Sequence, residues 1–217
     1  MNIKHWMVCG VFCLWMGTNA MAASTGFDEQ LLSLQKQWAH INYETPAKER
    51  EKAFEKLAVE AERMVQAYPD RPEPLIWKGI IVSTWAGARG GLGALSLVKE
   101  AKALFEHSME MDPAALSGSA YTSLGSLYYQ VPGWPIAFGD DKKAQKLLEQ
   151  AVKINPDGID SNYFYADYLM EEGDYAQAKV YFEKAMQAAP RANRMVADEG
   201  RRHEIMAKLE KVEKKLR

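Results

Sequence analysis

The sequence predicts an all-α protein in which antiparallel helix pairs stack into a solenoid with capping helices at its ends. Charged, amphipathic stretches with apolar residues at helical spacing follow one another along the chain. Four prolines each close such a stretch, and small apolar residues recur at matching positions between them. Repetition of one unit at this length is the sequence signature of a helical array. The prolines are Pro69, Pro113, Pro156 and Pro190, which are separated by 44, 43 and 34 residues.

The composition is that of an ordinary globular protein. Of the 217 residues, 47% are hydrophobic and 26% are charged, which excludes a disordered or fibrous chain. The 27 basic residues are balanced by 29 acidic ones, so the net charge is −2. Without a basic excess, neither nucleic acid nor an anionic membrane surface is an expected partner.

The first 22 residues have the pattern of a cleavable signal peptide. A basic start at Lys4 precedes an apolar run from Trp6 to Gly17, and Ala20-Met21-Ala22 offers small residues to a signal peptidase. The alternative is a retained membrane anchor, but the 12 residues of this run are fewer than the roughly 20 that span a bilayer. We therefore expect cleavage before Ala23, a periplasmic or secreted location, and no membrane-spanning segment in the mature chain.

Residues 23–70 are expected to form an N-terminal helical cap or a degenerate repeat. Two helices are predicted, over residues 28–39 and 47–67. The second helix carries apolar residues at intervals of three and four, which is typical of a helix with one buried face. This stripe consists of Phe54, Leu57, Ala58, Ala61, Met64 and Val65.

Residues 71–190 divide into three helix-turn-helix units, 71–113, 114–156 and 157–190. The third unit is the most regular. Its small apolar residues allow two antiparallel helices to approach closely, and larger ones fill the space between them. These residues are Tyr165, Ala166 and Leu169 on the first helix, and Ala178, Phe182 and Ala185 on the second.

The two earlier units repeat this pattern with an insertion between their helices. The second unit has an insertion of seven residues near 131–138, and the first has one of ten near 85–95. The first unit departs from the pattern at two positions: Lys78 stands where an apolar residue is expected, and Ser108 stands where alanine is expected. The matching residues are Leu124, Gly125, Tyr128, Ala144, Leu148 and Ala151 in the second unit, and Gly79, Val82, Ala101 and Phe105 in the first.

With these residues and spacings, the segment from Arg71 to Pro190 resembles the tetratricopeptide repeat family, and the predicted signal peptide makes the chain similar to exported bacterial members. The resemblance implies an α-α superhelix that presents a binding surface to a protein or peptide, whose identity the sequence does not give. Residues 191–217 suit a C-terminal capping helix, because such an array must close its last apolar face.

The concave face of such an array is the first candidate site, because the first helix of each unit lines it. The expected groove is apolar to neutral in the first two units and acidic in the third. It lacks the basic and asparagine side chains with which some family members hold a peptide carboxylate. Its candidate binding residues are Ile76, Ile80, Thr122, Ser126, Tyr129, Tyr163, Asp167 and Met170.

The two insertions are the second candidate site, because both must emerge at the same edge of the array. Trp85 and Arg89 belong to the first insertion, and Trp134 and Phe138 to the second. Burying such aromatic side chains is favourable by a few kcal/mol each, so we expect them to be covered. Either the two loops cover each other, or they form a site for a partner or ligand.

No motif in the sequence indicates catalysis. The segment from Gly87 to Gly93 lacks the strand before it that a phosphate-binding loop requires, and Asp140-Asp141 fits a helix N-terminus. The only cysteines, Cys9 and Cys13, lie in the predicted signal peptide, so the mature chain would carry no thiol. We therefore predict a protein that is not an enzyme and uses no metal or cofactor.

The leading hypothesis is a non-catalytic exported scaffold that binds a protein or peptide through the concave groove or the insertion loops. The alternative is a small-molecule-binding periplasmic component, similar to the repeat proteins associated with tripartite ATP-independent periplasmic transporters, which would hold a small apolar ligand. A closed apolar pocket beneath Trp85 and Trp134 would favour the alternative, and an open groove with exposed aromatic residues would favour the leading hypothesis.

Overall fold

The computed structural model describes residues 17–217, with side chains from residue 26 onward, and over this range it contains nine helices and no strand. The helices are α1 (Gly17–Tyr43), α2 (Ala47–Ala67), α3 (Pro72–Arg89), α4 (Ala94–Met111), α5 (Ala115–Gln130), α6 (Asp141–Ile154), α7 (Ile159–Glu171), α8 (Tyr175–Met186) and α9 (Met195–Leu216).

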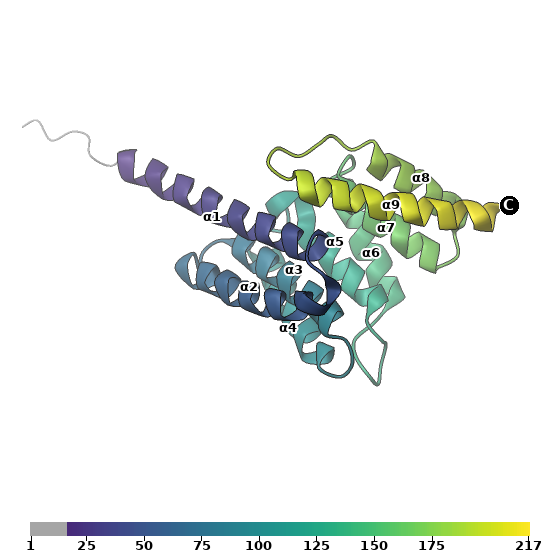
Figure 1. The fold of residues 1–217 in the computed structure, drawn as a ribbon, viewed down its shortest axis with the longest axis horizontal. Coiled ribbons are helices and arrows are strands. Elements are labelled where there is room, and N and C mark those ends of the chain that lie inside the picture. The colour runs from purple at the N-terminus through teal and green to yellow at the C-terminus, as the bar shows by residue number, and fades with distance from the viewer. Residues whose placement is uncertain (1–16) are drawn as a thin grey trace, which may run out of the picture.

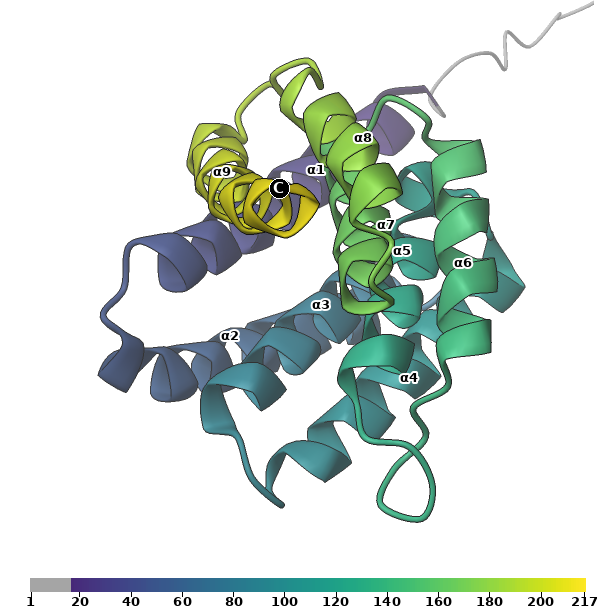
Figure 2. The same ribbon diagram turned by 90° about the vertical axis from the view of Figure 1, so that its right-hand side faces the viewer.

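Consecutive helices pack in antiparallel pairs, and the pairs stack into a curved array (Figures 1 and 2). The pairs α3–α4, α5–α6 and α7–α8 correspond to the three predicted units. Helices α4 and α6 lie on the outer side of the array, and α3, α5 and α7 lie further in (Figure 2). The prediction of an all-α helical repeat fold is confirmed.

Small residues set the spacing within each pair, as the sequence predicts. A methyl group added at Gly79 of α3 would lie 2.5 Å from the ring of Phe105 on α4. Gly125 of α5 meets Leu148 of α6 in the same way, at 2.7 Å. In the third pair, Ala166 takes this place and is fully buried. The repeat therefore places a small residue of the first helix against a large one of the second.

The connections within the second and third pairs carry the predicted N-caps. Asp140 Oδ1 accepts a hydrogen bond from the backbone N–H of Lys143 at the start of α6. Asp174 Oδ1 does the same for the N–H of Gln177 at the start of α8. These carboxylates satisfy N–H groups that have no partner within the helix, so they have a structural role.

The first insertion differs from the predicted loop. Trp85 to Arg89 belong to α3, and α4 begins at Ala94, so the connection is only residues 90–93. The extra residues lengthen the two helices, and Gly90 and Gly91, with φ angles of 66° and 59°, make the short reversal that glycine tolerates. The second insertion does form a loop, over residues 131–140.

The N-terminal helix is also longer than predicted. It extends over Gly17–Tyr43, whereas the sequence suggests residues 28–39. Of the predicted signal peptide, residues 1–16 lie outside the described residues, and residues 17–22 belong to the first turns of α1. Cleavage before Ala23 stays a prediction.

Two glycines of α3 provide a matched test of this packing. Gly79→Ala is expected to destabilise the protein by about 1–3 kcal/mol, because the added methyl overlaps the buried ring of Phe105. Gly87→Ala is expected to stabilise it by about 0.5–1 kcal/mol, because the position is exposed and alanine is the better helix former. Urea unfolding of both variants measures the effects. Equal signs would contradict this close approach of α3 and α4.

Candidate functional site

The concave face is covered by the first and last helices of the chain. Helix α9 packs against α7 and α8, α1 packs against α2 and α3, and the two end helices also contact each other (Figure 1). Five of the eight predicted groove residues are buried, and the other three are partly buried. The buried ones are Ile76, Thr122, Ser126, Tyr163 and Asp167; the partly buried ones are Ile80, Tyr129 and Met170. An open concave groove is therefore a wrong prediction.

Helix α9 holds the third unit through charge and aromatic contacts. Lys208 Nζ lies 2.5 Å from Asp167 Oδ1, and the hydroxyl of Tyr129 donates a hydrogen bond to Asp167 Oδ2 at 2.9 Å. Burial and the nearby Asp167 charge raise the pKa of Tyr129 well above its usual value. The guanidinium carbon of Arg201 lies 4.2 Å from the centre of the Tyr163 ring. These groove residues therefore bind the protein's own C-terminal helix.

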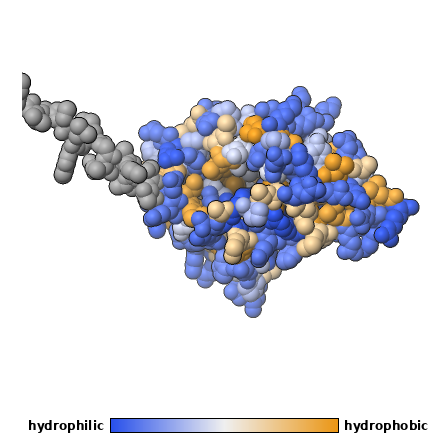
Figure 3. All heavy atoms as spheres, turned by 90° about the horizontal axis from the view of Figure 1, so that it is seen from above, coloured by the Kyte–Doolittle hydropathy of each residue, from blue (hydrophilic) through white to orange (hydrophobic). Residues whose placement is uncertain are grey.

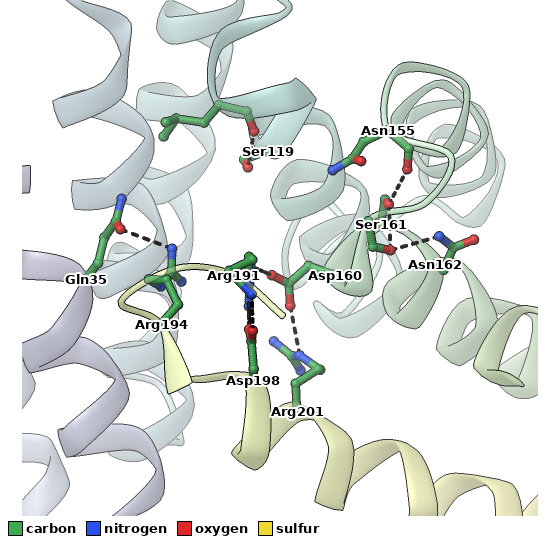
Figure 4. A network of polar contacts seen from close by, with 12 residues as sticks. Gln35, Ser119, Asn155, Asp160, Ser161, Asn162, Arg191, Arg194, Asp198 and Arg201 are labelled. Carbon is green, nitrogen blue, oxygen red and sulfur yellow. Dashed lines mark hydrogen bonds and ion pairs between the residues drawn. The ribbon is translucent and has the colours of Figure 1, made fainter. Parts of the chain in front are cut away.

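A network of carboxylates and arginines fixes the start of α9 (Figure 4). Arg191 Nη1 and Arg201 Nε donate hydrogen bonds to the two carboxylate oxygens of Asp160, at 2.7 and 2.9 Å. Arg191 Nε also donates to Asp198 Oδ1, at 2.7 Å. Burial alone would raise the pKa of Asp160, but the charges of Arg201 and Arg191 outweigh it and lower this pKa to about 2.

Helix α1 fills the first unit in a similar way. The ring of Trp38 lies 6.0 Å from that of Trp77 on α3, in an edge-to-face arrangement. The Nε1 of Trp38 donates a hydrogen bond to Thr84 Oγ1 at 3.0 Å. Aromatic pairs of this geometry stabilise beyond the area they bury. Helix α1 thus packs on the first unit, and the assignment of residues 23–70 as a cap or a degenerate repeat stays a prediction.

The open site is a groove at one edge of the array, which we call the rim groove. It lies between the connection 90–93 and the loop 131–140, which project at the same end of the molecule (Figure 2). Its volume is about 540 Å³. Residues of both connections therefore line one groove. Most lining residues are apolar or glycine: Ala86, Gly87, Gly91, Leu92, Ala94, Leu95, Val98, Leu127, Val131, Pro132 and Ile136, with Ser83 and Gln130.

The four residues predicted for this edge do not form a joint cluster. Trp134 is 89% exposed at the loop tip, which contradicts the expectation that it is covered. Phe138 is partly buried against Tyr128, with ring centres 5.5 Å apart. Trp85 is partly buried on the last turns of α3. The exposed Arg89 lies 3.7 Å from a carboxylate oxygen of Glu51 on α2. Because α3 continues through Trp85, its side chain is held at the helix rather than on a loop.

Two side chains that the sequence analysis did not single out are central to the rim groove. Leu92 is 85% exposed and Ile136 is 61% exposed, and they line the groove from its two opposite connections. Val180 on α8 is also exposed, at 59%, but does not line this groove. The face seen in Figure 3 is mostly hydrophilic, with apolar residues in separate patches. The sequence could have indicated this groove, because Leu92 and Ile136 are apolar residues within the two predicted insertions.

Neither a metal-ligand cluster nor a helix able to span a membrane is found among the described residues. Over this part of the chain, no three histidine, cysteine or acidic side chains are grouped as metal ligands. No helix in the same range has the length and apolar content needed to cross a bilayer.

The comparison with protein families agrees with the third unit. The family model described as tetratricopeptide repeat matches residues 136–197. These residues are similar to a tetratricopeptide repeat. The match includes α6, α7 and α8, where the sequence pattern is also most regular.

Individual proteins resemble the chain over different lengths. The human antiviral innate immune response effector IFIT1 is 34% identical over 89 residues, which are 41% of this chain and 18% of that protein. The match thus spans about a fifth of that relative. A tetratricopeptide repeat protein of the bacterium Thermus thermophilus, TTC0263, has 15% identity and a TM-score of 0.42, covering 82% of this chain and 98% of that one. The pilF protein of Pseudomonas aeruginosa has 13% identity and a TM-score of 0.35, covering 86% and 93%.

The Asp160 network predicts a specific loss of stability in acid. Because the pKa of Asp160 is lowered on folding from 3.8 to about 2, its contribution is present above about pH 4 and is lost as the pH falls toward 2. Asp160→Asn is expected to cost about 1–3 kcal/mol at pH 7, since it weakens two charged hydrogen bonds. The difference in the free energy of unfolding between wild type and variant should become smaller by pH 2.5. Urea unfolding at several pH values measures it, with the exposed Glu210→Gln as control. A difference in unfolding free energy that does not change with pH would contradict the lowered pKa of Asp160.

Proposed function

We propose that this chain is an exported, non-catalytic scaffold that binds an apolar segment of another protein in the rim groove. The observation that carries the proposal is the groove itself: a hollow of about 540 Å³ with a predominantly apolar lining and a largely exposed aliphatic residue on each of its two connections. Contiguous exposed apolar surface is a mark of interaction sites, because it is unfavourable in water.

The geometry of the rim suits a partner better than a structural cap. If the loops served only to cover helix ends, their apolar side chains would be turned inward. Instead Leu92, Trp134 and Ile136 remain exposed, beside a groove floored by residues of α3, α4 and α5. Exposed anchors around a preformed groove on a rigid scaffold are what a protein-binding site requires.

The same geometry argues against a small apolar ligand beneath Trp85 and Trp134. Trp134 would have to roof such a pocket, but it projects into solvent. The rim is thus open, which favours an elongated segment that leaves part of itself outside. Tetratricopeptide repeats commonly serve as protein-interaction scaffolds, which supports the same choice. The concave face does not offer this role, since α1 and α9 occupy it.

The proposed location outside the cytoplasm rests on the sequence of residues 1–22, with its basic start, apolar run and Ala-Met-Ala end. Intact-mass measurement of the protein from an envelope fraction is expected to give a chain that begins at Ala23, within a residue or two. Such a chain lacks Cys9 and Cys13 and does not react with a thiol reagent. Full-length protein in the membrane fraction would contradict export as a free scaffold.

The rim groove is tested by placing a photo-crosslinking amino acid at position 136 in cells that express the protein. Adducts with a defined protein are expected there and not at the matched position 180, where Val180 is an exposed apolar residue of α8 outside the groove. Leu92→Glu should reduce the adduct yield at least tenfold, because a charge would have to enter an apolar contact. The same variant should leave urea unfolding unchanged, since Leu92 is 85% exposed. Equal yields at positions 136 and 180, or no effect of Leu92→Glu, would contradict the proposal.

A further inference from the structure

A second pocket lies where helix α1 meets the beginning of helix α9. It has a volume of about 390 Å³ and lies between α1 and the beginning of α9. Gln35, Lys36 and Ala39 form the α1 side, and residues 193–197 form the other side. None of these residues lines the rim groove, so the two sites are separate. Its size is at the lower end of the range for small-molecule sites.

The distinctive feature of this pocket is the charge of Arg194. Its Nη1 donates a hydrogen bond to the neutral amide oxygen Oε1 of Gln35, at 3.1 Å (Figure 4). Its Nε is buried and has no acceptor. Its guanidinium carbon lies 5.0 Å from the centre of the Trp77 ring. Among the described residues, no carboxylate lies within ion-pair distance of this guanidinium.

The neighbouring arginines, unlike Arg194, form ion pairs. Arg191 and Arg201 each lie in direct contact with carboxylates, as described above. Burial and the adjacent Arg191 lower the pKa of Arg194 to about 10, so it still carries its proton at neutral pH. Asp160 and Asp198 stabilise this charge only from beyond ion-pair distance, so the hydration that the guanidinium loses on burial is only partly replaced. The complement it lacks is an anionic oxygen group.

The rest of the pocket lining supports an anion with an apolar body. Lys36 places a second basic residue in the wall. The first turn of α9 has no side-chain cap at Arg194, and the acidic residue of that turn, Asp198, is already paired with Arg191. Ala39, Val196 and Ala197 provide apolar surface on either side of the polar residues. No acidic residue is part of the lining.

We propose that this pocket binds a small molecule that carries one anionic oxygen group, a carboxylate or a phosphate, on a short apolar body. Arg194 receives the anionic group through the terminal nitrogens of its guanidinium, since Nε is buried, and the apolar body lies between α1 and the first turn of α9. Because the ligand contacts both α1 and α9, its binding stabilises the contact between these two helices. The site is independent of the rim groove, so either proposal can fail without the other.

The test is isothermal titration calorimetry of the mature protein with four probes: octanoate, octyl phosphate, octanol and inorganic phosphate. One or both of the amphiphilic anions are expected to bind, and the tighter of the two identifies the head group. Octanol and inorganic phosphate are expected to bind at least tenfold more weakly, since each lacks half of the required chemistry. Arg194→Gln should weaken binding of the amphiphilic anion at least tenfold. Arg202→Gln is the matched control, because Arg202 donates to the backbone oxygen of Ala188 outside the pocket.

Four results would overturn the proposal. These are equal binding of the anion by wild type and Arg194→Gln, octanol that binds as tightly as octanoate, inorganic phosphate that binds as tightly as either amphiphile, and no binding of any probe. A thermal melt checks that Arg194→Gln is folded. If it is not, Lys36→Gln takes its place: this residue is exposed on α1, and a threefold or greater weakening is expected. Unchanged binding in Lys36→Gln would then count against the site.

Discussion

The carboxylate of Asp160 is the contact on which the closed shape of this molecule depends. It lies in the first turn of α7, and it accepts hydrogen bonds from two arginines that are 31 and 41 residues further along the chain. Those arginines bring the start of α9 onto the inner side of the array. From there α9 continues along α7 and α8, with Lys208 paired to Asp167. An ion pair of this kind is favourable when several hydrogen bonds satisfy both partners, as they do here.

Closure by α9 and α1 changes what a helical repeat array can do. In an open solenoid each unit contacts only its neighbours, and the curved inner surface is free to bind an extended partner. Here Trp38 packs on Trp77 at one end of the inner surface, and Arg201 packs on Tyr163 at the other. The first and last helices also contact each other, so the array has long-range contacts that tie its ends together.

With the inner surface occupied, the two hollows of the described surface lie where the repeat is interrupted. One interruption is the pair of connections that border the rim groove, which have no counterpart in the short turn between α7 and α8. The other is the junction of α1 and α9, where the repeat ends and Arg194 is left with a neutral partner. In both cases the regular units form the scaffold, and the proposed sites lie at the exceptions to the repeat.

The sequence by itself determined the helices, their pairing and the small residues at which they cross, because these depend on contacts between neighbours in the chain. Gly79, Gly125 and Ala166 take corresponding places in the three pairs. The capping roles of Asp140 and Asp174 and the common edge of the two insertions follow from the same local rules. Only the tertiary structure decided whether the concave face is open, since that depends on where α1 and α9 pack, and polar contacts across 31 to 159 residues leave no periodic signal in the sequence. It also decided that Trp85 lies on α3 and that Trp134 is exposed, because the length of α3 and the direction of the loop 131–140 are set by packing and not by hydrophobicity alone.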